Sequence, residues 1–321
     1  MIYIFAPCNA ASGGPELLQQ LCMKIRNLGG AASMVYYYSY FIVKPNQQVS
    51  DRYASYENPI SDKILDSPEN TIVVPEVGTH LLRRYHKVKK VIWWLSVDNY
   101  YKKKKEWSYR INTGFGLFAP ILTDCHVMHL YQSYYAREHL RKLSIQPECQ
   151  MELSDYLNHA FIENAYKEQS QIKQNRVLYN PKKGFEYTQQ LMIAMVDLEW
   201  QPLQGMTPDQ MSHVMQTSKL YIDFGEHPGK DRIPREAAIS GCCILTGKRG
   251  AAKNEFDIPV PSQYKIDQGV MPLADVEKKI RFILNNYESC RQDFDTYRNK
   301  IRHEEEKFEH DTQRFLDWAT T

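Results

Sequence analysis

Apolar and polar positions along this chain follow two alternating spacings, one typical of buried strands and the other of amphipathic helices. The compact apolar run at residues 2–7 predicts a strand, and apolar positions three or four residues apart in 16–28 predict a helix that ends at Gly29-Gly30. The same reasoning predicts strands at 32–38, 71–75, 91–97 and 127–132, and helices at 79–86 and 134–143. Because strands and helices alternate, we expect a first α/β unit with a parallel sheet, ending near residue 155.

A second series begins after a polar helical stretch at 156–174, which could link the two halves. It predicts strands at 176–179, 220–224 and 242–246, helices at 185–195, 207–217 and 234–239, and a helical pattern from Ala274 to the end. A chain of 321 residues is long enough for two domains. We therefore expect two α/β units in tandem.

Composition narrows the classes of protein to consider. Hydrophobic residues make up 43% and charged residues 24%, which is ordinary for a globular protein, and a net charge of +2 gives no general attraction to nucleic acid. The seven cysteines are odd in number and form no Cys-x-x-Cys pair, which favours reduced thiols in a cytoplasm over disulfides or a zinc site. The start, MIYIFAPC, lacks a basic region and is expected to be a buried strand rather than a signal peptide. No apolar run approaches the ~18 residues of a membrane span.

Basic residues are concentrated at 83–105, where nine Lys or Arg residues accompany a single Asp. Such a segment could contact phosphates or anionic lipid. A solvated helix face and loop explains it equally well.

Candidate site residues are expected directly after strands, because open parallel sheets bind ligands at the carboxyl ends of their strands. Gly13-Gly14 follow the first strand and precede a helix, so that backbone N–H groups can approach an anionic ligand. The Gly-x-Gly-x-x-Gly dinucleotide fingerprint is missing, and a tight turn without a ligand is an equal alternative.

Asn180-Pro181-Lys182-Lys183-Gly184 follows the first strand of the second series. Two lysines at this position can neutralise a diphosphate, and a pyrophosphate leaving group needs such cations because its negative charge grows as the glycosidic bond breaks. This position favours a ligand role over a solvated turn.

The stretch at residues 223–242 is the most informative. A strand there ends in a loop rich in Gly, Pro and charge, and Glu236 lies in the first turn of a short helix, where its carboxylate can accept hydrogen bonds from a ribose diol. Lys230, Arg232 and Arg235 place cations near it in sequence. An interaction of Glu236 with the helix dipole alone would not explain so many unusual residues in one loop.

Residues 235–241, Arg-Glu-Ala-Ala-Ile-Ser-Gly, resemble the second half of the signature loop of GT-B-fold glycosyltransferases, above all the family-4-type (group 1) retaining enzymes of bacterial surface-polysaccharide synthesis. In that family, two Glu separated by seven residues occupy this loop. Here Pro228 stands at the upstream position, and the nearest carboxylate is Glu226. Residues 11–16 resemble the family's Gly-Gly loop, and Lys182-Lys183 stand where the family has an Arg/Lys pair.

The resemblance implies the GT-B fold, an α/β architecture of two Rossmann-like domains facing each other across a cleft, with a C-terminal helix crossing back to the first domain. It implies an acceptor-side domain at 1–160, a nucleotide-sugar-binding domain at 175–300 and a returning helix at 301–321. It also implies that Glu236 holds the nucleotide ribose and that no metal or other cofactor is needed. The expected nucleotide-sugar-binding set is Gly13, Gly14, Asn180, Lys182, Lys183, Lys230, Arg232, Arg235 and Glu236.

Three carboxylates are candidates for the catalytic group, because an inverting enzyme needs a general base for the acceptor hydroxyl. Asp98, after the strand expected at 91–97, is the first choice and Glu76, after the strand at 71–75, the second. Glu226 in the loop is the third. Asp98 and Glu76 could also merely cap a helix or a turn.

We therefore expect a cytoplasmic glycosyltransferase of the hexosyltransferase type. It would move a sugar from a nucleotide diphospho-sugar to a saccharide or lipid-linked saccharide, in capsule or O-antigen synthesis, with peripheral contact between residues 83–105 and an anionic membrane and with no nucleic acid as partner. An epimerase or phosphorylase on the same fold, or a non-catalytic sugar-nucleotide- or polysaccharide-binding protein, are the alternatives.

Overall fold

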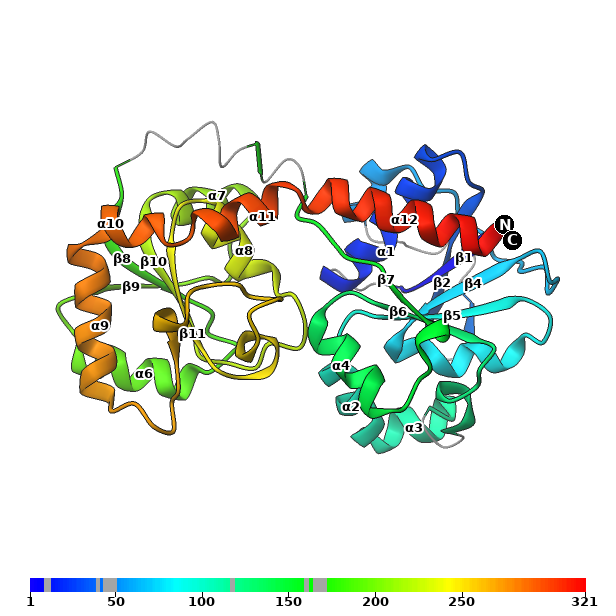
Figure 1. Cartoon of the computed structure of the whole chain (residues 1–321), viewed down its shortest axis with the longest axis horizontal. Helices are drawn as coiled ribbons and strands as arrows, with labels where there is room; N and C mark the ends of the chain where they lie inside the picture. The colour runs from blue at the N-terminus through cyan, green and yellow to red at the C-terminus, as the bar shows by residue number, and fades with distance from the viewer. Residues whose placement is uncertain (9–12, 39–40, 43–50, 116–118, 159–161, 164–171) are drawn as a thin grey trace. The chain divides into compact units, whose positions relative to one another are not determined.

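The computed structural model describes residues 1–8, 13–38, 41–42, 51–115, 119–158, 162–163 and 172–321. They form two compact units (Figure 1). Unit 1 contains Met1–Asp155 and Glu306–Thr321, and unit 2 contains Tyr156–Glu305.

Unit 1 is built on a seven-stranded sheet with the order β3-β2-β1-β4-β5-β6-β7. Its strands are β1 (Ile2–Pro7), β2 (Ala32–Tyr38), β3 (Phe41–Ile42), β4 (Thr71–Pro75), β5 (Lys89–Trp94), β6 (Val127–Tyr131) and β7 (Gln150–Glu152). All neighbours are parallel except β2 and β3. The central strands are apolar and buried because helices cover both faces of a parallel sheet.

Helices cover this sheet on its two faces: α1 and α12 lie along one, and α2, α3 and α4 along the other (Figure 1). The helical elements of unit 1 are α1 (Gly13–Asn27), α2 (Val97–Lys105), α3 (Trp107–Thr113), α4 (Tyr134–Lys142), most of α12 (Glu304–Thr320), and the 3-10 helices η1 (Asp51–Tyr56), η2 (Glu76–Arg84), η3 (Ala119–Leu122) and η4 (Pro147–Cys149). Phe308 of α12 stacks on Trp93 with ring centroids 6.4 Å apart, and Asp311 accepts a hydrogen bond from the Ser154 amide at 3.1 Å. The C-terminal helix therefore returns to the first unit, as expected.

Unit 2 has a five-stranded parallel sheet with the order β12-β11-β10-β8-β9. Its strands are β8 (Gln174–Tyr179), β9 (Glu199–Pro202), β10 (Ser218–Asp223), β11 (Cys243–Gly247) and β12 (Lys265–Ile266). Its helices are α6 (Phe185–Ala194), α7 (Pro208–Gln216), α8 (Arg232–Ile239), α9 (Leu273–Asn285), α10 (Tyr287–Gln292), α11 (Asp295–Arg302), η5 (Gly250–Lys253) and η6 (Ser262–Tyr264). Thr207 and Gln210 form a capping box that starts α7.

One difference from the sequence prediction changes a candidate residue. The strand expected at 91–97 ends at Trp94, because the Ser96 hydroxyl accepts the Asn99 amide at 3.2 Å and so caps α2. Asp98 therefore lies in the first turn of a helix rather than directly after a strand.

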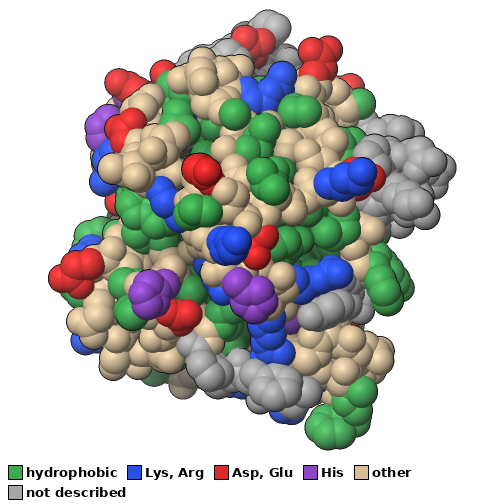
Figure 2. Space-filling view, turned by 90° about the vertical axis from the view of Figure 1, so that its right-hand side faces the viewer, with side chains coloured by type: hydrophobic (Ala, Val, Ile, Leu, Met, Phe, Trp, Pro, Cys, Tyr) green, Lys and Arg blue, Asp and Glu red, His purple; other side chains and the backbone are tan. Residues whose placement is uncertain are grey.

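On the face of the molecule that Figure 2 presents, basic, acidic and apolar side chains are interspersed, in keeping with the small net charge. None of the helices in the described ranges is both long and apolar enough to cross a lipid bilayer.

Candidate active site

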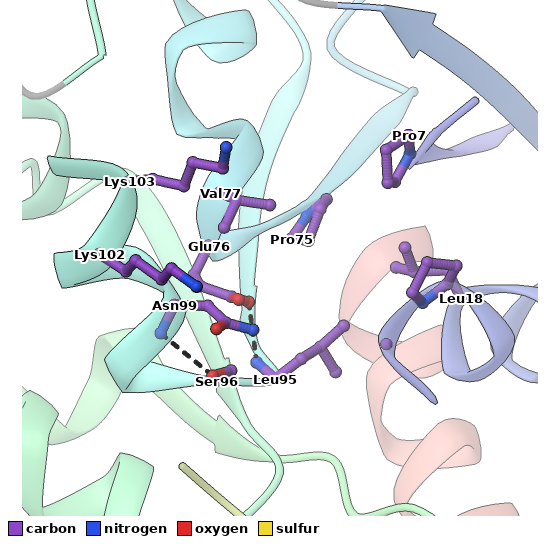
Figure 3. Close-up of a pocket in the computed structure, with 12 residues that line it drawn as sticks. Pro7, Leu18, Pro75, Glu76, Val77, Leu95, Ser96, Asn99, Lys102 and Lys103 are labelled. Atoms are coloured by element: carbon purple, nitrogen blue, oxygen red, sulfur yellow. Dashed lines mark hydrogen bonds between the residues drawn. The ribbon is translucent and has the colours of Figure 1, made fainter. Parts of the chain in front are cut away.

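A cavity of about 380 Å³ lies in unit 1 at the carboxyl ends of β1, β4 and β5 (Figure 3). This is within the range of small-molecule binding pockets. Its apolar wall consists of Pro7, Pro15, Leu18, Pro75, Val77 and Leu95, and its other lining residues are Gly14, Glu76, Ser96, Asn99, Lys102 and Lys103. The cavity thus brings together Gly14, Glu76 and two lysines of the basic segment.

Glu76 is the carboxylate that lines this cavity. It is the first residue of η2, directly after β4, and only 3% of it is exposed. Its Oε2 accepts a hydrogen bond from the Leu95 amide at 3.0 Å, so the side chain is fixed between two strand ends (Figure 3). Burial raises the pKa of Glu76 to about 7, although backbone hydrogen bonds, including that from Leu95, oppose the shift. Such a carboxyl exchanges its proton near neutral pH, as a general base must.

Asp98 does not line the cavity. It is half-buried in α2 and accepts a hydrogen bond from the Tyr135 hydroxyl at 3.0 Å. The geometry favours Glu76 over Asp98 as the carboxylate for an acceptor, the reverse of the order in which the sequence ranked them.

Gly13 and Gly14 are the first two residues of α1, in unit 1. The preceding Ser12 lies outside the described residues. A Cβ at Gly14 would lie 3.6 Å from the Leu95 side chain, an ordinary contact, so packing does not require glycine there.

Two loops at the carboxyl ends of β8 and β10 carry the site of unit 2, and their backbones touch. A Cβ at Gly184, which has a φ of +60°, would lie 2.4 Å from the Phe224 carbonyl carbon. A Cβ at Gly225 would lie 2.4 Å from the Lys183 Cβ. Glycine at both positions therefore allows the lysine loop to lie directly on the signature loop.

The lysine loop is shaped by Asn180, whose Oδ1 accepts the Lys182 amide at 3.0 Å. Lys182 is exposed. The Lys183 ammonium instead lies 2.6 Å from Asp231 Oδ2 on the neighbouring loop. One of the two lysines expected to bind phosphate is thus already held in place by a carboxylate.

Glu236 lies in α8 with its side chain 6% exposed, and Arg232 one turn earlier binds its Oε1 through Nε at 2.8 Å and a second nitrogen at 2.7 Å. The carboxylate is therefore oriented before any nucleotide binds.

Lys230 and Arg235 were expected to contact the nucleotide sugar, but the structure places both cations on Glu304. The distances to its two oxygens are 2.9 Å and 2.8 Å, and the three side chains are 8%, 1% and 4% exposed. Arg235 also donates to the carbonyls of Lys230 and Asp231, at 3.1 Å and 3.3 Å. This arrangement favours a structural role for both cations, because their charges are neutralised inside the unit. A direct contact with a ligand stays a prediction.

Glu226 points to solvent, with 63% of its side chain exposed, and the Arg249 guanidinium lies 3.9 Å away. Among the described residues, no ordered contact fixes it as Arg232 fixes Glu236.

A buried cluster that was not predicted from the sequence lies beside Lys183. His227 is 0% exposed, its Nδ1 lies 2.8 Å from Asp231 Oδ2, and its Nε2 lies 3.7 Å from Asp223 Oδ1. The regular spacing of Asp223, His227 and Asp231, four residues apart, was the signal that could have revealed it.

Two groups within the described ranges bring possible metal ligands within 4.8 Å of one another: Asp223, His227 and Asp231, and the exposed Asp124, Cys125 and His126. In the first group the Lys183 ammonium already neutralises Asp231. The expectation that no metal is needed stays a prediction.

No family model and no curated protein matches the chain. Solved structures match it over nearly its whole length. A glycosyltransferase from Rickettsia africae ESF-5 has a TM-score of 0.63 and 9% identity, with 99% of this chain and 97% of that chain covered. Sucrose-phosphate synthase from Thermosynechococcus elongatus has a TM-score of 0.68 and 10% identity, with 99% and 98% covered. HepE from Anabaena, solved in complex with UDP-glucose, has a TM-score of 0.62 and 8% identity, with 98% and 99% covered.

This chain has the GT-B fold. The resemblance stated from the Gly-Gly loop, the lysine pair and residues 235–241 is therefore confirmed at the level of fold. Identities of 8–10% carry no residue's role from one GT-B protein to another, so the roles of the side chains rest on the geometry described above.

Proposed function

We propose that this GT-B protein is a glycosyltransferase that moves a sugar from a nucleotide diphospho-sugar to a saccharide or lipid-linked saccharide. The observation that carries the proposal is in unit 2, where the loop of Lys182 and Lys183 lies directly on the signature loop that leads to Glu236. A cationic loop and an oriented carboxylate at one end of a parallel sheet suit the diphosphate and the ribose of one nucleotide.

On the donor side, Lys182 and Lys183 would neutralise the charge that develops on the leaving diphosphate, and Glu236 would accept hydrogen bonds from the ribose hydroxyls. The positive charge that the leaving group needs would then come from these lysine side chains rather than from a metal ion. We therefore propose a metal-independent reaction, for which excess EDTA should leave the rate unchanged.

On the acceptor side, the cavity of unit 1 would take the sugar that receives the transfer. Its apolar wall suits the hydrophobic face of a sugar ring, and Glu76 is placed to accept the proton of the attacking hydroxyl. A general base of this kind belongs to an inverting reaction, so the anomeric configuration of the product tests this role directly.

A role in surface-polysaccharide synthesis at the inner face of an anionic membrane is the finer part of the proposal. Lys102, Lys104 and Lys105 are exposed on α2, and the exposed Trp107 and Ile111 follow on α3. Basic and aromatic side chains together suit an anionic lipid surface. Replacing Lys102–Lys105 by Gln should release the protein from vesicles that contain phosphatidylglycerol, whereas replacing Lys87, Lys89 and Lys90 should change binding less. Equal binding by all three proteins would remove the membrane contact.

The first experiment is ligand-detected NMR with UDP, GDP, ADP and dTDP and their sugars, on the wild type and on Lys182→Ala/Lys183→Ala. Selective binding of one nucleotide that the double variant loses supports the donor site. Release of the nucleoside diphosphate only when an acceptor is present then identifies a transferase. Turnover without release favours an epimerase, dependence on inorganic phosphate favours a phosphorylase, and binding without turnover favours a binding protein.

A further inference from the structure

One oxygen of Asp231 faces both a lysine ammonium and a histidine ring. Asp231 Oδ2 lies 2.6 Å from the Lys183 ammonium and 2.8 Å from His227 Nδ1. The three side chains are 15%, 29% and 0% exposed, in the order Asp231, Lys183 and His227. Lys183 is therefore the member of this group that remains open to solvent and to a ligand.

The surroundings of His227 are acidic. Asp223 Oδ1 lies 3.7 Å from its Nε2, and Asp223 is fixed in turn by the Tyr221 hydroxyl at 2.8 Å and the Gly225 amide at 3.0 Å. The 3-10 helix η5 contacts His227 through its backbone, since the Ala251 amide donates a hydrogen bond to the His227 carbonyl at 2.8 Å. In the part of the chain that the structure describes, the charged groups that act on the ring are Asp231, Asp223 and Lys183.

This environment favours a charged imidazole. Burial by itself lowers the pKa of His227, but the carboxylates of Asp231 and Asp223 outweigh burial and the repulsion from Lys183, so that the pKa lies above its ordinary value. Nδ1 faces Asp231 at 2.8 Å and Nε2 faces Asp223 at 3.7 Å. A charged ring, which carries a proton on each nitrogen, is therefore attracted by both carboxylates.

We propose that His227 and Asp231 are positioning residues that hold the Lys183 ammonium at the diphosphate of the donor, with the charge of His227 offsetting that of Asp231. The inference rests on the proposed function, since it takes Lys183 as a phosphate ligand. A lysine has a flexible stem, and its anchoring by Asp231 fixes the ammonium before the ligand arrives. The negative charge of Asp231, by itself, would repel a diphosphate. With His227 charged, the formal charges of Lys183, His227, Asp223 and Asp231 cancel, and the repulsion is removed.

The arrangement predicts a pH dependence with a definite sign. As the pH rises through the pKa of His227, the ring loses its charge, the cluster gains a net negative charge, and a nucleoside diphosphate binds more weakly. By reciprocity, a bound diphosphate raises the pKa of His227.

The test is calorimetric titration across the neutral pH range, in EDTA, with whichever of UDP, GDP, ADP and dTDP binds the wild type best. His227→Gln should bind roughly tenfold more weakly at neutral pH, a size usual for coupling between sites. The affinity of this variant should also vary with pH only through the titration of the nucleotide itself. His126→Gln is the matched control, because His126 lies 3.0 Å from Asp124 but is exposed in unit 1, and it should reproduce the wild-type profile.

Asp231→Asn provides a second test if His227→Gln does not fold. The loss of one carboxylate lowers the pKa of His227, so the midpoint of the pH profile should move to lower pH. Profiles that run parallel in the wild type and the variants would overturn the positioning role while leaving the donor site in place. A wild type that binds none of the four nucleotides would instead overturn the proposed function itself.

Discussion

In unit 1 the carboxyl end of the sheet borders a cavity of about 380 Å³ with a largely apolar wall, whereas the loops at the corresponding end of unit 2 carry ion pairs around Asp231 and Glu304. Both ends are built from parallel strands and loops that lead into helices. The difference lies in the side chains. Unit 1 offers a cavity with a largely apolar wall and a carboxyl whose pKa is raised to about 7, while unit 2 offers cations held by carboxylates.

This difference matches a division of chemical roles. A proton acceptor benefits from burial because the loss of water raises the pKa of a carboxyl, as it does for Glu76. A site for a diphosphate needs fixed positive charge, which persists in a folded protein only when nearby carboxylates balance it. Three variants test each side of the comparison, from the largest expected effect to the smallest.

Glu76→Gln should give the largest effect. Loss of a general base typically lowers the rate by 10²–10⁴-fold, and the wild-type rate should rise with pH through about 7 as Glu76 loses its proton. The measurement is kcat against pH. Glu69→Gln, at an exposed position, should leave the profile unchanged. A variant with full activity would show that the cavity does not supply the base.

The same substitution should stabilise the protein at alkaline pH. Because the pKa of Glu76 is raised from 4.5 to about 7, the folded state binds this proton more tightly, and the stability that Glu76 contributes is lost as pH rises across that interval. Glu76→Gln should therefore be more stable than the wild type by up to about 3 kcal/mol above this interval and by much less below it. Thermal unfolding at both ends of the interval checks the sign.

Glu304→Gln should cost about 3–5 kcal/mol of stability, because it removes a buried carboxylate that pairs with both Lys230 and Arg235. Urea unfolding measures the loss. Glu306→Gln is the control, since Glu306 is exposed two residues away and should change stability by less than about 0.5 kcal/mol. A small loss in both variants would mean that the ion pairs of unit 2 do not hold its loops.

Glu236→Ala should have the smallest effect of the three. Arg232 is 35% exposed and can be solvated when its partner is removed, so folding should change little. The loss of a hydrogen bond to a charged group should weaken nucleotide binding roughly tenfold, with kcat nearly unchanged. An unchanged KM for the donor would exclude Glu236 as the ribose ligand.

Much of the fold follows from local pattern. The strands expected at 2–7, 32–38 and 71–75 have the observed bounds, because each is a compact apolar run buried on both faces. The strand expected at 91–97 was too long, since apolar Val97 continues the run although Ser96 already caps a helix. The short strands β3, β7, β9 and β12 were missed because two to four residues carry too little pattern.

The candidate site was less predictable, because its properties depend on contacts between distant residues. The sequence identified Lys183 and Glu76 as candidates, but the partner of Lys183 is 48 residues away and the burial of Glu76 depends on a neighbouring strand. The pairing of Arg235 with Glu304 joins residues 69 positions apart, so it could not be predicted from the local sequence. A single histidine in a loop gives no sequence signal for a site, so His227 was not identified before the structure placed Asp223 and Asp231 around it.

The path of the chain also sets an order of assembly. Unit 2 is one continuous segment, whereas unit 1 needs residues 306–321, which leave the ribosome after unit 2. Until they do, Trp93 lacks its stacking partner Phe308 and the Ser154 amide lacks Asp311. During synthesis, the unit that is made second can therefore complete its folding first, while the earlier-made unit waits with an apolar face uncovered.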